Sequence, residues 1–260
     1  MGPAQTMTSS SHRPAAEKRS YRRLAILGRL ASFQVTVQET DLMIQSEEDL
    51  TDVCREEILT QRGYIEHYIQ RFPEFRTTLT PWNLDQPAPE IVRKMIAAGK
   101  KAGVGPMAAV AGAMAETIGQ LLRRHSNEVI VENGGDIYLA LKGSVTIGLF
   151  AGQSPLSMRI GLQLEPGREP LAVCTSSGTV GHSLSFGRAD AVCIVARQCA
   201  LADAAATAVA NRVPSGDAIP EAIRFARTIE GVEGVVAVCG EQMGLWGDLR
   251  IVRLDRGKKA

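Results

Sequence analysis

The segment 174–208 gathers most of the residues in this chain that could do chemistry. It begins with a loop rich in hydroxyl groups and glycine, formed by Thr175, Ser176, Ser177 and Gly178. It ends with LADAAATA at 201–208, an alanine-rich stretch that carries a carboxylate and a hydroxyl. Hydroxyl and backbone N–H groups of such loops bind anions, phosphate among them. The sequence therefore predicts a ligand site in this segment.

The carboxylate and the hydroxyl are Asp203 and Thr207, four residues apart. On a helix, residues at this spacing lie on the same face. An all-oxygen pair of this kind suits Mg²⁺, which also keeps water and phosphate oxygens as ligands. In the alternative interpretation, Asp203 caps or decorates a helix start and Thr207 bonds back to a backbone carbonyl. The spacing alone leaves both open.

Two residues beside the loop are candidates for catalysis. His182, flanked by glycine, could act as a general acid or base, or it could be a solvated loop histidine. Cys174 could be a thiolate nucleophile if a local positive field lowers its pKa. Alternatively, it is a small core residue at the end of an apolar strand.

Two glycine-containing stretches elsewhere are also informative. NGGD at 133–136 interrupts an apolar strand pattern with Gly134 and Gly135, and Asp136 follows them directly. Adjacent glycines in a strand indicate a bulge, a tight turn or a close approach of the backbone to another group. The stretch 105–116 suggests a helix start against which something presses, and packing against another helix is the alternative.

Composition narrows the class of protein. The chain has 260 residues, 45% of them hydrophobic, which is enough for a large core. Lys and Arg number 29 against 28 for Asp and Glu, and aromatic residues make up only 5%. Neither a basic surface nor a base-stacking surface is indicated, so we expect no nucleic-acid partner. No apolar run approaches the length of a membrane span, so no membrane partner is expected either.

The cysteines and the N-terminus bear on the compartment. Five cysteines, an odd number with no CxxC spacing, argue against a disulfide scaffold or a zinc site and favour a reducing cytoplasm. The first twenty residues contain no apolar signal-like region. We expect residues 1–20 to form a disordered tail and residues 21–260 to form one domain.

The order of expected elements indicates an α+β fold. Strands are expected over 24–47 with a turn near Glu39, and helices over 47–70, 90–101 and from about 105 to 125. A meander of three strands is expected over 128–152, then strands at 158–164, 170–178 and 189–196, the last buried on both faces. Helices near 199–211 and 217–229 precede short final strands. This order favours a largely antiparallel or mixed sheet with packed helices, apolar enough to support a homodimer.

Together these pieces resemble the ApbE-like superfamily, whose best-known members are FAD:protein FMN transferases. Those proteins carry, in order, a GAIAKG-like helix start, a strand ending in GG[DN], a TSG loop, a histidine and an ADA-x-ATA helix. This chain shows AGAMAE at 111–116, ENGGDIY at 132–138, TSSG at 175–178, His182, and LADAAATA at 201–208. The N-terminal half looks less like the lipoprotein transferases than like a soluble, poorly characterised branch of the superfamily. That branch occurs in methanogens and sulfate reducers and has a suggested link to sulfide assimilation.

The resemblance implies a site. Asp203 and Thr207 would bind Mg²⁺ together with a backbone carbonyl near Ala113 or Ala115. The site for FAD or another nucleotide would be lined by residues of the two loops: Gly134, Gly135, Asp136, Thr175, Ser176, Ser177 and Gly178. Two departures concern the flavin half of this site: Glu116 stands at the family's lysine position, and His182 comes only four residues after Gly178, followed by SLSFG.

Three hypotheses about function follow. In the first, a Mg²⁺-dependent enzyme acts on a phosphate-bearing ligand by phosphoryl-type transfer, with His182 or Asp136 assisting proton transfer. In the second, a sulfur-handling protein uses Cys174 as carrier or nucleophile. In the third, the fold serves as a non-catalytic binding or assembly module.

Overall fold

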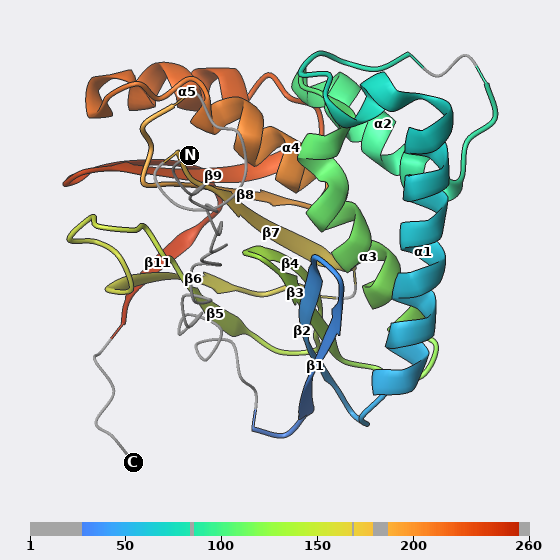
Figure 1. The fold of residues 1–260 in the computed structure, drawn as a ribbon. Coiled ribbons are helices and arrows are strands. Elements are labelled where there is room, and N and C mark those ends of the chain that lie inside the picture. The colour runs from blue at the N-terminus through green and yellow to red at the C-terminus, as the bar shows by residue number, and fades with distance from the viewer. Residues whose placement is uncertain (1–27, 84–85, 168, 179–186, 255–260) are drawn as a thin grey trace, which may run out of the picture.

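The computed structural model describes residues 28–83, 86–167, 169–178 and 187–254. The expected disordered tail at residues 1–20 and His182 lie outside these ranges. The described residues form an α+β fold in which helices cover one face of a large sheet (Figure 1). This confirms the predicted fold class, and every pairing between the described strands is antiparallel.

The strands form two sheets. The larger has eight strands in the order β1-β2-β3-β4-β7-β8-β9-β10, and the smaller has the order β11-β6-β5. The larger sheet consists of β1 Ala31–Val37, β2 Thr40–Ser46, β3 Val129–Asn133, β4 Asp136–Ala140, β7 Leu171–Ser176, β8 Ala191–Ala196, β9 Val232–Cys239 and β10 Gln242–Gly247. The smaller consists of β5 Val145–Gly148, β6 Ile160–Leu164 and β11 Arg250–Arg253.

The helices lie where the sequence predicts them, with small shifts at their ends. They are α1 Thr51–Arg71, α2 Glu90–Ala102, α3 Val110–Leu122, α4 Cys199–Ala210 and α5 Ile219–Ala226. Three short 3₁₀ turns accompany them: η2 Pro73–Arg76, η3 Pro106–Ala109 and η4 Gly216–Ala218. None of the helices in the described ranges is both long and apolar enough to cross a membrane.

The large sheet separates two hydrophobic cores. Alternation along β9 sends Val235 and Ala237 to the core beneath the helices, and Val236 and Val238 to the core beneath the small sheet. All residues of β8 are buried, as the unbroken apolar sequence predicts. Each face of the large sheet is therefore covered. Asp203 and Thr207 lie on the face that the helices cover.

The expected meander over 128–152 is wrong in its last strand. β3 and β4 form a hairpin, but the other neighbour of β4 is β7, and β5 pairs with β6 in the small sheet. In β5 only Val145 and Ile147 are buried, and the alternate residues Thr146 and Gly148 are partly exposed. A strand with one apolar face can cover the large sheet, whereas a central position in that sheet requires apolar residues on both faces.

Candidate functional site

Helices α3 and α4 lie against each other above the strands β4 and β7. Their backbones come into close contact at Gly112, where a Cβ atom would lie 2.3 Å from the carbonyl oxygen of Cys199 and 2.8 Å from the Cβ of Asp203. The helix start at 105–116 therefore packs against another helix, α4, as the alternative interpretation of this stretch predicts. Only glycine permits this contact, and it brings the start of α3 to the side chain of Asp203.

Helix α4 has one open face. Ten of its twelve residues are buried, and the two partly exposed ones are Asp203 and Thr207. The alanines around them bury the rest of the helix in the helix-side core. The helix therefore presents one carboxylate and one hydroxyl at its only accessible positions.

Asp203 also caps a helix, but not its own. Its Oδ2 accepts a hydrogen bond of 2.8 Å from the backbone N–H of Gly112, in the first turn of α3. The N-cap residue of α3, Ala109, makes no side-chain capping bond. Asp203 thus satisfies a free N–H at a helix start where the helix dipole favours negative charge.

In the alternative interpretation, Thr207 donates a hydrogen bond to a backbone carbonyl of its own helix. A bond of this kind is made by Thr117 on α3. Thr117 Oγ1 donates to the carbonyl of Ala113 at 2.8 Å. Among the side-chain hydrogen bonds of the described residues, none involves the Thr207 hydroxyl. Thr207 therefore has its lone pairs available for a ligand, whereas the Ala113 carbonyl already accepts a hydroxyl.

Asp136 lies close to Asp203 and shares its surroundings. It begins β4, is buried, and pairs in register with Cys174, which places it on the helix side of the sheet. Burial, and after it the negative charge of Asp203, raise the pKa of Asp136 well above its ordinary value. Burial likewise raises the pKa of Asp203 to about 7, although the N–H of Gly112 counteracts this. Two carboxyl groups that are poorly solvated and repel each other favour a shared proton or a cation.

The donor set fits a hard cation. No group of three or more His, Cys, Asp or Glu residues that could hold a metal ion is found in the described part of the chain. Asp203 and Thr207 instead supply oxygen atoms, and Mg²⁺ typically takes one or two carboxylates while it keeps water and phosphate ligands. The residues present are thus compatible with Mg²⁺.

The TSSG loop is divided by the pleat of β7. Cys174 belongs to the helix-side core and Val173 to the opposite one, so alternation puts Ser176 with the helices and Thr175 on the far side. The buried Ser176 hydroxyl has no hydrogen-bond partner among the described residues. The N–H of Gly178 donates to the carbonyl of Ala189 at 2.9 Å. Of these loop residues, Ser176 is therefore the one that shares the sheet face of Asp136 and offers a free polar group.

The NGGD stretch is a two-residue hairpin turn between β3 and β4. Gly134 and Gly135 both have positive φ, 68° and 111°, as the tight turn of a twisted hairpin requires. Glu132 Oε1 accepts from the Gly135 N–H at 2.8 Å, and Asn133 Nδ2 donates to the carbonyl of Ala111 at 3.0 Å. The turn is thus fastened to the start of α3, beside the helix that carries Asp203.

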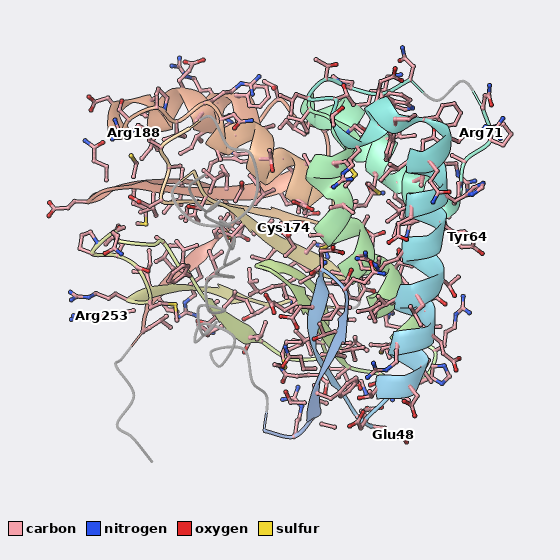
Figure 2. The ribbon with its side chains drawn as sticks, viewed as in Figure 1. Glu48, Tyr64, Arg71, Cys174, Arg188 and Arg253 are labelled. Carbon is pink, nitrogen blue, oxygen red and sulfur yellow. The ribbon has the colours of Figure 1, made fainter. Side chains whose placement is uncertain are left out.

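Cys174 lies in the interior, between the sheet and the helices (Figure 2). Its Sγ is 3.5 Å from the Sγ of Cys199, and both side chains are fully buried. Burial, followed by the hydrogen bond with Cys199, raises the pKa of the Cys174 thiol well above its ordinary value. A thiol in this environment stays protonated and is a poor nucleophile at neutral pH.

Glu116 points to the helix α4 rather than to an open site. It is buried, and its Oε2 accepts from the N–H groups of Cys199 at 2.8 Å and Ala200 at 3.4 Å. The ammonium group of Lys94 on α2 lies 3.1 Å from its other oxygen. Neither role was expected from the sequence, because Lys94 and Cys199 are far from Glu116 along the chain and no local spacing links them.

The fold and these residues define an ApbE-like α+β protein. A family model described as AbpE bacteria matches residues 23–243, and the chain belongs to that family.

Its relatives include UPF0280 proteins from methanogens. The one from Methanosarcina acetivorans is 42% identical over 78% of this chain and 81% of the relative, and the one from Methanococcus aeolicus is 40% identical over 85% and 92%. Among solved structures, the flavinyl transferase ApbE of Pseudomonas stutzeri matches with a TM-score of 0.57, 13% identity, and coverage of 84% of this chain and 93% of that one. The ApbE protein of Thermotoga maritima matches with a TM-score of 0.52 and 14% identity, and the match covers 83% of this chain and 96% of that one. The resemblance drawn from the motifs is confirmed, and at these identities the solved structures show the fold.

Proposed function

We propose that this protein binds a phosphate-bearing ligand, a flavin or another nucleotide, together with Mg²⁺, and that it is a transferase of the phosphoryl type. The observation that supports this most strongly is the face of α4 on which Asp203 and Thr207 are the only partly exposed residues. The name of a structural relative, a flavinyl transferase, points to the same class of ligand.

In this proposal each residue has a distinct task. Asp203 and Thr207 would hold the cation, which when bound neutralises phosphate charge. Ser176 would donate its hydroxyl to a phosphate oxygen, because it is buried on the same sheet face as Asp136 and has no partner among the described residues. Burial and the charge of Asp203 raise the pKa of Asp136 and favour its protonated form, so it would serve as the proton donor. His182 stays a prediction, because it lies outside the described residues.

The test is ligand-dependent stabilisation. The protein is heated in differential scanning fluorimetry with FAD or ATP, each with and without MgCl₂, alongside Asp203→Asn. Asparagine can still accept the hydrogen bond from the N–H of Gly112, but it lacks the negative charge of the carboxylate. We expect the wild type to gain about 2.7 kcal/mol at a ligand concentration one hundred times Kd, with Asp203→Asn showing no Mg²⁺-dependent gain. A wild type that responds to none of these ligands would leave the binding-module hypothesis in its place.

Sulfur chemistry at Cys174 is the weaker proposal, since burial raises the pKa of this thiol. Cys239 is the natural comparison, because it is partly exposed. We expect iodoacetamide to modify Cys239 at least about a hundredfold faster than Cys174, as measured by peptide mass spectrometry. Faster labelling or persulfidation of Cys174 would revive the sulfur-handling hypothesis.

Compartment and assembly are also proposals. All five cysteines are free, which agrees with a reducing cytoplasm. A homodimer would have an edge of the large sheet available, where β10 exposes Met243 and Leu245. Analytical ultracentrifugation of the purified protein measures the oligomeric state.

A further inference from the structure

Glu116 and Asp203 form a reciprocal connection between two helices. Glu116 lies on α3 and accepts from the first-turn N–H groups of α4, at Cys199 and Ala200. Asp203 lies on α4 and accepts from the first-turn N–H of α3, at Gly112. Each helix is thus capped by a carboxylate of the other, and neither N-cap residue, Ala109 or Gln198, makes a side-chain capping bond.

This arrangement restricts sliding between the helices. Gly112 and Glu116 are four residues apart on α3, and Cys199 and Asp203 are four residues apart on α4, so each pair spans about one helical turn. A shift of α4 along α3 would lengthen both capping bonds together. The close backbone contact at Gly112 acts in the same sense, because the two helices cannot rotate apart without losing it.

A third helix secures Glu116. Lys94 of α2 lies 3.1 Å from Glu116 Oε1, and Gln120 Nε2 donates to the same oxygen at 3.2 Å. With Oε2 directed to α4, both carboxylate oxygens are therefore occupied by donors. A buried carboxylate with this many partners keeps one orientation.

We propose that Glu116 is a positioning residue: through the first turn of α4 it sets the register in which Asp203 and Thr207 are presented to the cation. This rests on the proposed Mg²⁺ site. Mutation of a residue that orients metal ligands without touching the metal typically costs about 10- to 100-fold in metal affinity or activity. Glu116 thus has a function in the site, exerted through a helix rather than by direct contact with a ligand.

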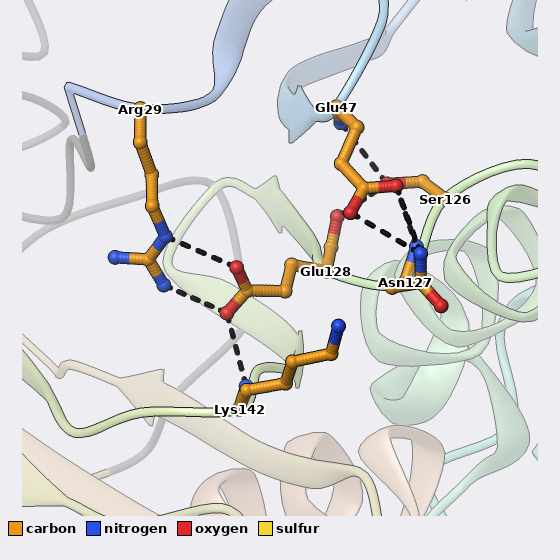
Figure 3. A network of polar contacts seen from close by, with 6 residues as sticks. All are labelled: Arg29, Glu47, Ser126, Asn127, Glu128 and Lys142. Carbon is orange, nitrogen blue, oxygen red and sulfur yellow. Dashed lines mark hydrogen bonds and ion pairs between the residues drawn. The ribbon is translucent and has the colours of Figure 1, made fainter.

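The competing explanation is that Glu116 only stabilises the fold. Glu128 provides the matched control, because its carboxylate likewise accepts a backbone N–H, from Lys142 at 3.0 Å, and pairs with a cation, Arg29 at 2.7 Å (Figure 3). Glu128 fastens the start of β3 and belongs to neither α3 nor α4. A purely structural role would make Glu116→Ala and Glu128→Ala behave alike towards a metal.

The experiment measures binding of Mn²⁺, used in place of Mg²⁺, by electron paramagnetic resonance, together with unfolding in urea. We expect Glu116→Ala to weaken Mn²⁺ binding about 10- to 100-fold, and Glu128→Ala to change it less than about twofold at a comparable loss of stability. Glu116→Gln keeps an acceptor for Cys199 and should restore most of the affinity. Equal Mn²⁺ affinities in Glu116→Ala and Glu128→Ala would overturn the proposal.

A second measurement needs no ligand and separates the two proposals. Amide hydrogen exchange at Gly112 reports the bond to Asp203, which Glu116 does not touch. We expect faster exchange at Gly112 in Glu116→Ala and an unchanged rate in Glu128→Ala. If the wild type binds no Mn²⁺, the proposed function fails, while exchange at Gly112 still decides whether Glu116 sets the register. An unchanged rate at Gly112 in Glu116→Ala would refute the positioning role by itself.

Discussion

The network around Glu128 and the contact between α3 and α4 use similar carboxylates for different ends. At Glu128 every negative group meets donors: Arg29 and the Lys142 N–H reach Glu128, and Asn127 reaches Glu47 (Figure 3). At the helix contact, Asp136 and Asp203 lie near each other and repel. Arg29 lowers the pKa of Glu128, whereas burial raises the pKa of Asp136 and Asp203.

The difference separates polar groups that stabilise the fold from those that we propose bind the ligand. A paired carboxylate stabilises the fold, whereas two dehydrated carboxyl groups destabilise it until a proton or a cation joins them. Such departures from good local pairing are expected at functional sites. The buried, unpartnered hydroxyl of Ser176 on the same sheet face is a second departure of this kind.

The largest expected effect is at the glycine that lets the two helices meet. Gly112→Ala would place a methyl group 2.3 Å from a backbone oxygen of α4, so the helices must separate. We expect a loss of about 3 kcal/mol or more in the free energy of unfolding, together with loss of metal binding. Urea denaturation and the Mn²⁺ titration measure the two.

The control for this variant is Gly63→Ala in the middle of α1, where an added Cβ would meet no atom within 4 Å. It should stabilise the protein by about 0.5–1 kcal/mol, because glycine is costly inside a helix. If Gly112→Ala were equally harmless, the close contact of α3 and α4 would not be needed to position the site.

A smaller effect on the free energy of unfolding is expected when a single charge is removed. Its sign is opposite at the helix contact and in the network around Glu128. Asp203→Asn keeps an acceptor for Gly112 and removes the repulsion with Asp136. In the metal-free protein at pH 8 it should raise the free energy of unfolding by about 1–2 kcal/mol, less than the full pKa shift implies because solvent reaches part of the side chain. The same variant should lose ligand binding.

This prediction distinguishes the two interpretations of Asp203. If Asp203→Asn destabilises the metal-free protein, the negative charge serves mainly the dipole of α3, and the site has a structural purpose. A gain in stability at the expense of binding is the behaviour expected of a functional group.

The sequence predicted the elements better than their connections. The helices expected over 47–70, 90–101 and 199–211 match α1, α2 and α4 closely, and the four-residue spacing of Asp203 and Thr207 predicted that they share one helix face. The position of β5 was wrong, because its pairing with β6 is set by which strand can bury both faces, a property of the whole sheet. The division of TSSG into Ser176 and Thr175 on opposite faces required the register of β7 with β4.

The links between helices could not be predicted at all. Glu116 meets Lys94 and Cys199 only because α2, α3 and α4 pack together, and no spacing in the sequence encodes these distances. The same holds for the bond from Gly112 to Asp203. The residue types indicated that a metal and a phosphate could be bound, and the packing shows which contacts position the residues of the proposed site.

The smallest expected effect tests the other side of the comparison, at Glu128. Its pKa lies below the ordinary value of 4.5, chiefly through the hydrogen bonds from Arg29. A lowered pKa means that this group stabilises the fold above pH 4.5 and that its contribution is lost as the pH falls through the lowered pKa. Because Arg29 is half exposed, we expect Glu128→Gln to cost less than about 1 kcal/mol at pH 7 and less than that at pH 3. Urea denaturation of both proteins at the two pH values measures this, and a difference that does not depend on pH would show that the ion pair adds nothing beyond the bond to the Lys142 N–H.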